Sequence, residues 1–194
     1  MSTPRHTHWE DAKLFLGKFL KHGIRIASIT PSSLTLSRAM TKDLRYDTAK
    51  IIVELGPGTG VMTTEILKKM RPRTRLLLVE NDPDFCRILR ERFPEAEIIE
   101  GSAKDLTTHL ATRGITQVDE IVCGLPLALL KKERIFAEIA KCLSPSGTMW
   151  QLTEIPWLFL PAYKKHFHNV RFHQVLSNIP PGGYYECRGA KRNV

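Results

Sequence analysis

The sequence predicts an α/β fold in which helices flank a doubly wound, mostly parallel sheet. Three observations support this prediction. Short apolar runs alternate with amphipathic stretches over residues 51–153, a glycine-rich turn directly follows the first apolar run, and two further runs flank a Pro-Pro-Gly-Gly turn near the C-terminus. Alternating strands and helices are typical of a parallel sheet with crossover helices. The last two runs predict an antiparallel hairpin at one edge of that sheet.

The order of the expected elements follows from the length and pattern of each segment. Short apolar runs predict buried strands, and longer segments with one apolar side predict helices. We also expect residues 1–45 to form an N-terminal segment of amphipathic helices and residues 46–194 to form the main domain. The expected strands are 51–55, 75–82, 97–100, 119–124, 148–153, 170–178 and 184–191, and the expected helices are 61–70, 82–93 and 131–143.

Composition narrows the choice of partners and compartment. The 194 residues carry a net charge of +9, which indicates an anionic partner such as nucleic acid or an acidic membrane surface. The four cysteines form no CxxC pair, so we expect no metal site, no disulfide framework and a reducing, cytoplasmic environment. No apolar run approaches the ~20 residues of a membrane span, and the N-terminus has no apolar signal-peptide core.

The glycine-rich turn in Ile51–Val61, IIVELGPGTGV, is the segment most informative about chemistry. Its glycines are spaced G-x-G-x-G, whereas a dinucleotide fold uses G-x-G-x-x-G and a P-loop continues with Gly-Lys-Ser/Thr. Glu80 ends the next strand, at the spacing where an acid accepts hydrogen bonds from ribose hydroxyls. A ribose site without a phosphate cradle predicts a nucleoside that carries an uncharged or cationic group.

The turn and the acid together resemble the class I S-adenosylmethionine-dependent methyltransferases. The resemblance implies S-adenosyl-L-methionine as cofactor and S-adenosyl-L-homocysteine as product. It also implies that the first loop lies against the methionine part, that the acid binds the ribose, and that residues after the third strand meet the adenine. Carried over to this sequence, the implied cofactor residues are Glu54, Gly56, Gly58, Thr59, Gly60, Glu80, Asn81, Ser102, Ala103 and Gly124.

The residues after the fourth strand bear on the methyl acceptor. The adenine-N6 methyltransferases of ribosomal RNA carry Asn-Leu-Pro-Tyr or a similar motif there, and their amide and aromatic ring hold the flipped base. This sequence has Gly124-Leu125-Pro126-Leu127 and lacks both groups. An enzyme of this type acting on RNA is therefore the alternative reading, and a non-catalytic binding module is a second one.

Gly-Leu-Pro-Leu resembles the bacterial phospholipid N-methyltransferases, which methylate phosphatidylethanolamine, and the related ornithine-lipid N-methyltransferases. A second match to these families lies near the N-terminus. Phe15 is followed by Ile26-Ala27-Ser28-Ile29-Thr30-Pro31-Ser32-Ser33 and then by Leu36, Arg38 and Met40. The resemblance thus spans nearly the whole chain and implies a lipid substrate.

The N-terminal segment has the pattern of a basic amphipathic helix. On a helical wheel, its aromatic and aliphatic residues fall on one face and its lysines on the others. Such a helix is typical of the interface of an anionic membrane. The alternative is a helix that packs its apolar face on the domain. Both hold if the helix is a lid that opens at the bilayer. We therefore expect a monomeric protein, peripheral on the cytoplasmic face of the membrane. The apolar face consists of Trp9, Ala12, Phe15, Leu16, Phe19 and Leu20.

Methyl transfer to an amine asks for alignment and exclusion of water more than for a reactive side chain. The residues expected to face the amine are Leu125, Pro126, Tyr184 and Tyr185. Aromatic rings suit methylated ammonium groups, and a tyrosine hydroxyl is a possible proton relay. The alternative is that both tyrosines only pack the sheet edge. The three histidines near the C-terminus are interpreted as surface residues: His166, His168 and His173.

Overall fold

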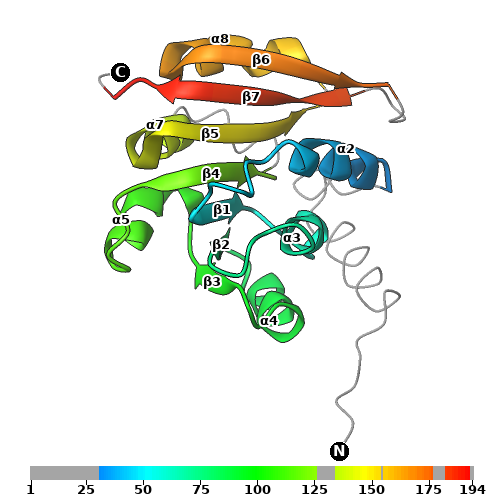
Figure 1. Ribbon diagram of the computed structural model, residues 1–194, viewed down its shortest axis with the longest axis vertical. Coiled ribbons are helices and arrows are strands. Elements are labelled where there is room, and N and C mark those ends of the chain that lie inside the picture. The colour runs from blue at the N-terminus through cyan, green and yellow to red at the C-terminus, as the bar shows by residue number, and fades with distance from the viewer. Residues whose placement is uncertain (1–30, 126–133, 154, 177–181, 193–194) are drawn as a thin grey trace, which may run out of the picture.

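The computed structural model describes residues 31–125, 134–153, 155–176 and 182–192. The expected N-terminal amphipathic helix and Pro126 lie outside these ranges. The described chain forms a seven-stranded sheet in the order β3-β2-β1-β4-β5-β7-β6 (Figure 1). The strands are β1 (Ile51–Leu55), β2 (Arg75–Glu80), β3 (Glu97–Glu100), β4 (Val118–Cys123), β5 (Leu143–Thr153), β6 (Phe167–Val175) and β7 (Gly182–Ala190).

The predicted α/β fold is confirmed. Strands β1 to β5 pair in parallel, and β7 lies antiparallel between β5 and β6. The sheet is therefore mostly parallel with an antiparallel hairpin at one edge, as the sequence predicts. The helices are α2 (Pro31–Lys42), α3 (Val61–Leu67), α4 (Pro83–Arg92), the short 3-10 helix η2 (Ala103–Asp105), α5 (Leu106–Ala111), α7 (Arg134–Cys142) and α8 (Pro156–His166).

Two helices, α5 and α8, are absent from the sequence prediction. Helix α8 contains Pro161 in its interior and has no side-chain cap at Ile155. Proline within a helix disfavours the helical backbone, so the sequence alone predicts an irregular segment here. Phe159 and Tyr163 are buried against the sheet, and tertiary packing rather than local preference therefore fixes the helix.

The helices form one layer on each face of the sheet (Figure 1). The core on one face joins the sheet to α2, α3 and α4, with Met40 of α2 fully buried. The core on the other face joins it to α5, α7 and α8. Strands such as β1 are apolar on both sides because both faces are covered. Among the helices that the structure describes, none is both long and apolar enough to cross a bilayer.

A buried ion pair connects the chain after α2 to the centre of the sheet. The Arg45 guanidinium lies 2.6 Å from the carboxylate of Glu120, which is fully buried in β4. The indole N–H of Trp150 on β5 donates a second hydrogen bond of 2.6 Å to that carboxylate. Burial raises the pKa of Glu120, while Trp150 and Arg45 act in the opposite direction.

The substitution Arg45→Met tests this link. It leaves a buried carboxylate with only the indole donor, and we expect a loss of about 2 kcal/mol in the free energy of unfolding, since Arg45 is partly exposed. The loss shrinks as pH falls, because burial raises the pKa of Glu120 and favours the protonated, uncharged carboxyl. Denaturant titrations at several pH values measure both effects. Arg87→Met, which breaks an exposed pair with Glu91, is the control and should change little.

Candidate functional site

The turns after β1, β2 and β4 meet at the carboxyl edge of the sheet, and backbone hydrogen bonds hold them together. The N–H of Gly56 donates to Val79, and the N–H of Gly101 donates to Glu80. The N–H of Gly124 donates 2.9 Å to the carbonyl of Leu55. In open parallel sheets, ligands bind at this edge. The sequence-predicted cofactor residues are thus brought together by the strand order.

Glycine is required in the first turn by backbone shape and by space. Gly56, Gly58 and Gly60 have φ values of +68°, +57° and +83°, which L side chains rarely adopt. A Cβ at Gly60 would also overlap the ring of Phe93. Arg92 holds the same turn from outside, because its guanidinium donates 2.7 Å to the carbonyl of Thr59. The turn therefore has a fixed shape.

Gly124 allows the first turn and the turn after β4 to approach each other. A Cβ there would lie 3.1 Å from the carbonyl oxygen of Gly56 and against the methyl group of Met62. The side chain of Leu125 lies beside Gly56 in turn, since a Cβ at Gly56 would meet it at 2.6 Å. Leu125 is half-buried and packs on the core, so it forms an apolar wall next to the glycine turn.

Glu80 organises the turn and keeps capacity for a ligand. Its carboxylate is 7% exposed and accepts hydrogen bonds from the backbone N–H groups of Gly58 at 3.1 Å, Asn81 at 2.9 Å and Asp82 at 3.0 Å. Burial raises its pKa, and the three N–H donors oppose this shift. A carboxylate has about four acceptor positions, so Glu80 can accept one more hydrogen bond, as a ribose hydroxyl requires.

Glu54 is fully buried at the end of β1 and is only half satisfied. Its Oε2 accepts a 2.7 Å hydrogen bond from the hydroxyl of Thr63, whereas its Oε1 has no hydrogen-bond partner in the described chain. Burial raises the pKa of Glu54 to about 8. A buried acceptor without a partner is costly. A cationic ligand at the glycine turn would relieve this cost, and the methionine ammonium of S-adenosylmethionine fits the requirement.

The residues predicted to border the adenine lie at the ends of β2 and β3. Asn81 is exposed, and Ala103 is 8% exposed. The Ser102 hydroxyl oxygen accepts a 3.2 Å hydrogen bond from the N–H of Lys104 and so caps η2. The hydroxyl keeps its hydrogen as a donor and one further acceptor lone pair. The position beside the ribose acid agrees with the predicted role, which remains a prediction for each residue.

Tyr184 and Tyr185 point to opposite faces of the sheet. The hydroxyl of Tyr184 donates 2.5 Å to Asp43 beside α2, and that of Tyr185 donates 2.7 Å to the carbonyl of Pro156 in α8. The Tyr184 ring also stacks on His173 with a centroid separation of 4.8 Å. Neighbouring residues of a strand alternate between faces, so only one of the two can face a given ligand.

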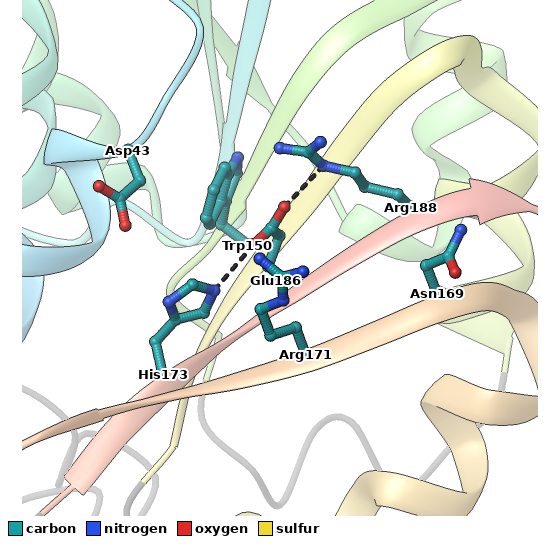
Figure 2. Close-up of a pocket in the computed structure, with 7 residues that line it drawn as sticks. All are labelled: Asp43, Trp150, Asn169, Arg171, His173, Glu186 and Arg188. Carbon is teal, nitrogen blue, oxygen red and sulfur yellow. Dashed lines mark hydrogen bonds and ion pairs between the residues drawn. The ribbon is translucent and has the colours of Figure 1, made fainter.

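A pocket of about 420 Å³ opens on the edge strands beside α2. Figure 2 shows Glu186 at its centre, 2.8 Å from His173 and 2.6 Å from Arg188. Its walls come from β5, β6, β7 and the end of α2, two or more strands away from β1. The pocket is therefore separate from the glycine turn.

Sequence reasoning missed several contributors to the site. Thr63 was found only through its contact with Glu54, although its place in the first turn of the helix after the glycines is a usable signal. Asp43 and Arg92 were also missed, because they reach the site only through contacts between segments that are distant in the sequence. The prediction that His166 is a surface residue is wrong: it is 3% exposed and packs near Phe136.

Comparison with known proteins agrees with this geometry. A family model described as a methyltransferase domain matches residues 52–147. The ornithine lipid N-methyltransferase of Singulisphaera acidiphila is 44% identical over 190 residues, covering 95% of this chain and 99% of that protein. A ribosomal RNA small subunit methyltransferase A from Chlorobaculum parvum is 33% identical over 66 residues, covering 34% of this chain and 23% of that protein.

Solved structures support the same fold at low sequence identity. The O-methyltransferase TomG from Streptomyces achromogenes, in complex with SAM, has a TM-score of 0.68 at 14% identity and covers 94% of this chain and 90% of its own. The O-methyltransferase from Bacillus cereus, in complex with SAH, has a TM-score of 0.65 at 12% identity, with the same two coverages.

Fold, glycine turn and buried acids define a class I S-adenosylmethionine-dependent methyltransferase. The near full-length match to the Singulisphaera enzyme goes further. The chain belongs to the ornithine lipid N-methyltransferase family.

Glu54→Gln should separate cofactor binding from stability. The folded chain holds a proton on Glu54 more tightly than the unfolded chain does, because burial raises the pKa of this group. The contribution of that proton to the free energy of unfolding is lost as pH rises through about 8. The neutral glutamine escapes that loss, so the cofactor-free variant should melt above the wild type at alkaline pH. The variant should bind S-adenosylmethionine roughly ten times more weakly, the equivalent of about 1.4 kcal/mol.

Calorimetric titration and thermal melts across pH measure the two effects of Glu54→Gln. Thr64→Val, in the same helix and bonded to the carbonyl of Gly60, is the control for general disturbance of this region. Unchanged cofactor affinity in Glu54→Gln would contradict the assigned role.

Proposed function

We propose that this protein transfers a methyl group from S-adenosylmethionine to the amine of an ornithine lipid. The observation that carries the proposal is the 44% identity over nearly the full length of both chains. Phosphatidylethanolamine, the other substrate that the sequence indicates, is the competing acceptor. The bound cofactor supplies an activated methyl group on a sulfonium, so the protein needs mainly to align the amine and exclude water.

The residues around the glycine turn support direct transfer. Glu54 and Glu80 lie beside the glycine turn and are the proposed partners of a cationic nucleoside, and Leu125 supplies an apolar wall beside Gly56. Cys123 ends β4 nearby, but burial raises the pKa of its thiol to about 12. A protonated, fully buried thiol is a poor nucleophile, so it is not the methyl carrier. The neutral amine would therefore take the methyl group directly, with the carbon–sulfur bond broken, S-adenosylhomocysteine as the leaving group and the amine proton released.

The alternative acceptor, an RNA base, is less well supported. The matches to ribosomal RNA methyltransferases cover about a third of the chain or less, whereas the lipid-enzyme match covers 95%. The position after β4 holds Gly124 and Leu125, without the amide that would bind a base. RNA binding would instead show a steep dependence on salt.

One of the two tyrosines, Tyr184 or Tyr185, is proposed to position the amine. Burial raises the pKa of Tyr184 and of Tyr185, so both phenols remain protonated donors. Tyr184 is linked to Asp43, which follows α2, and thereby connects the N-terminal segment to the start of β7. Leu125 and Pro126 complete the proposed acceptor wall.

The membrane proposal concerns residues 1–45. We propose that the predicted basic helix contacts the anionic cytoplasmic face of the membrane and that the segment acts as a lid on a monomeric enzyme. Each basic residue near such a surface contributes roughly 1 kcal/mol. Helix α2, the described end of this segment, packs on α3 with Leu36 and Met40 buried.

A transfer assay in mixed micelles tests the proposed function. With labelled S-adenosylmethionine, ornithine lipid should acquire label and phosphatidylethanolamine much less. Glu80→Ala should reduce the incorporated label by at least about a hundredfold, since it removes the ribose acceptor and loosens the turn. Cofactor binding with no label in either lipid would overturn the proposal and direct the search to RNA and protein acceptors.

Paired phenylalanine variants test the tyrosines. Tyr184→Phe or Tyr185→Phe should lower kcat by roughly tenfold if that hydroxyl handles the amine or its proton. A change in stability alone, with kcat within about twofold of wild type, would assign both rings to packing. Steady-state kinetics and thermal melts on the same samples distinguish the two results.

A further inference from the structure

Four large apolar side chains are strongly exposed in the described chain. Ile155 is 39% exposed, Trp157 74%, Leu158 46% and Leu176 77%. Large exposed apolar side chains that gather in one place mark an interaction surface. We refer to these four residues as the apolar rim.

The strand register brings the apolar rim to one edge of the sheet. Thr153, at the end of β5, pairs with Gly183, and Val175, at the end of β6, pairs with Gly182. With neighbouring strands ~4.8 Å apart, the two strand ends lie about 10 Å from each other. Ile155 and Leu176 each follow one of these ends within two residues, so both ends of the rim lie at the same edge of the sheet.

That edge is also the edge of the cofactor site. Strand β5 is parallel to β4, with Cys123 opposite Gln151, and β4 is parallel to β1, with Leu55 opposite Cys123. The carboxyl ends of β1, β4 and β5 therefore point the same way, as the strand arrows of Figure 1 also indicate for β4. The apolar rim therefore lies at the same edge of the sheet as the glycine turn, with β4 between β5 and β1.

Helix α8 has the surface chemistry of an interfacial helix. Phe159, Tyr163 and His166 face the protein, while Trp157 and Leu158 are exposed near the start of the helix. Lys164 and Lys165 are exposed in the last turn, and residues 156–166 include no acid. Tryptophan with basic residues and no acids is the composition of surfaces that lie in a membrane interface.

We propose that the apolar rim inserts into the interface of a lipid bilayer and holds the mouth of the active site against it. A bilayer is favoured over a second protein because the exposed charged residues of α8 are lysines, beside exposed Trp157 and Leu158, and the chain carries +9. The inference rests on the proposed function, because the contact would let the amine of a lipid reach the site while the lipid stays in the bilayer. It adds a membrane contact on α8 and β6, separate from the N-terminal helix.

Vesicle binding tests the rim. The variant Trp157→Gln/Leu158→Gln/Leu176→Gln should bind vesicles of equal parts phosphatidylcholine and phosphatidylglycerol at least about tenfold more weakly than wild type, because three buried contacts are lost. Thr116→Gln, at the exposed opposite edge, is the control and should bind like wild type. Calorimetric titration with S-adenosylmethionine should give the same affinity for all three proteins.

Fluorescence locates the inserted residue. The chain has three tryptophans, so Trp9→Phe leaves Trp150, which is 1% exposed, and Trp157. Brominated phosphatidylcholine in the vesicles should quench the emission of this variant, and adding Trp157→Gln should abolish the quenching. Vesicle binding without quenching would overturn the proposal. A wild-type dimer that becomes a monomer in the rim variant, measured by solution mass, would also overturn it and would assign the rim to a second copy of the chain.

The same samples separate this inference from the proposed function. If rim variants methylate ornithine lipid in detergent micelles but lose activity on vesicles, both stand. If they bind and methylate vesicles like wild type, the rim inference fails and the lipid function stands. If wild type binds vesicles through Trp157 but methylates no lipid, the function fails, while the bilayer contact is supported.

Discussion

The close approach of two backbone turns at the carboxyl edge is the constraint on which the site depends. The turn after β4 hydrogen-bonds to the end of β1 through Gly124, and a side chain there would press on the carbonyl of Gly56. Because glycine stands at both positions, the turns meet without displacing either strand. The buried acids at the strand ends and the wall formed by Leu125 all take their positions from this contact.

The site carries an electrostatic cost that a cationic cofactor offsets. Glu54 is fully buried, and one of its oxygens has no hydrogen-bond partner among the described residues. Glu80 satisfies backbone donors while burial raises its pKa. Natural proteins keep such unfavourable arrangements where a ligand needs them. The neighbouring strands are apolar and covered on both faces, so the rest of the sheet supplies the stability that holds these carboxylates in place.

The two halves of the sheet have different tasks. The parallel half, β1 to β4, carries the residues proposed to bind the cofactor, whereas the hairpin of β6 and β7 extends the sheet and packs against α8. The hairpin places the tyrosine pair and the exposed apolar residues along the same edge as the glycine turn. This edge of the sheet therefore suits the proposed substrate, a lipid whose amine reaches the site while the lipid stays in the bilayer.

The sequence by itself determined the parallel sheet, the glycine turn and the acid at Glu80, because these depend on local spacing and on the period of apolar residues. It could not find α8, because Pro161 inside the segment opposes a helix until Phe159 and Tyr163 are packed. Nor could it assign the tyrosines: adjacent residues take opposite faces, and only the register with β5 and β6 decides which neighbours each one meets. The unpartnered oxygen of Glu54 likewise appeared only in three dimensions, since burial and hydrogen bonding are properties of contacts between distant segments.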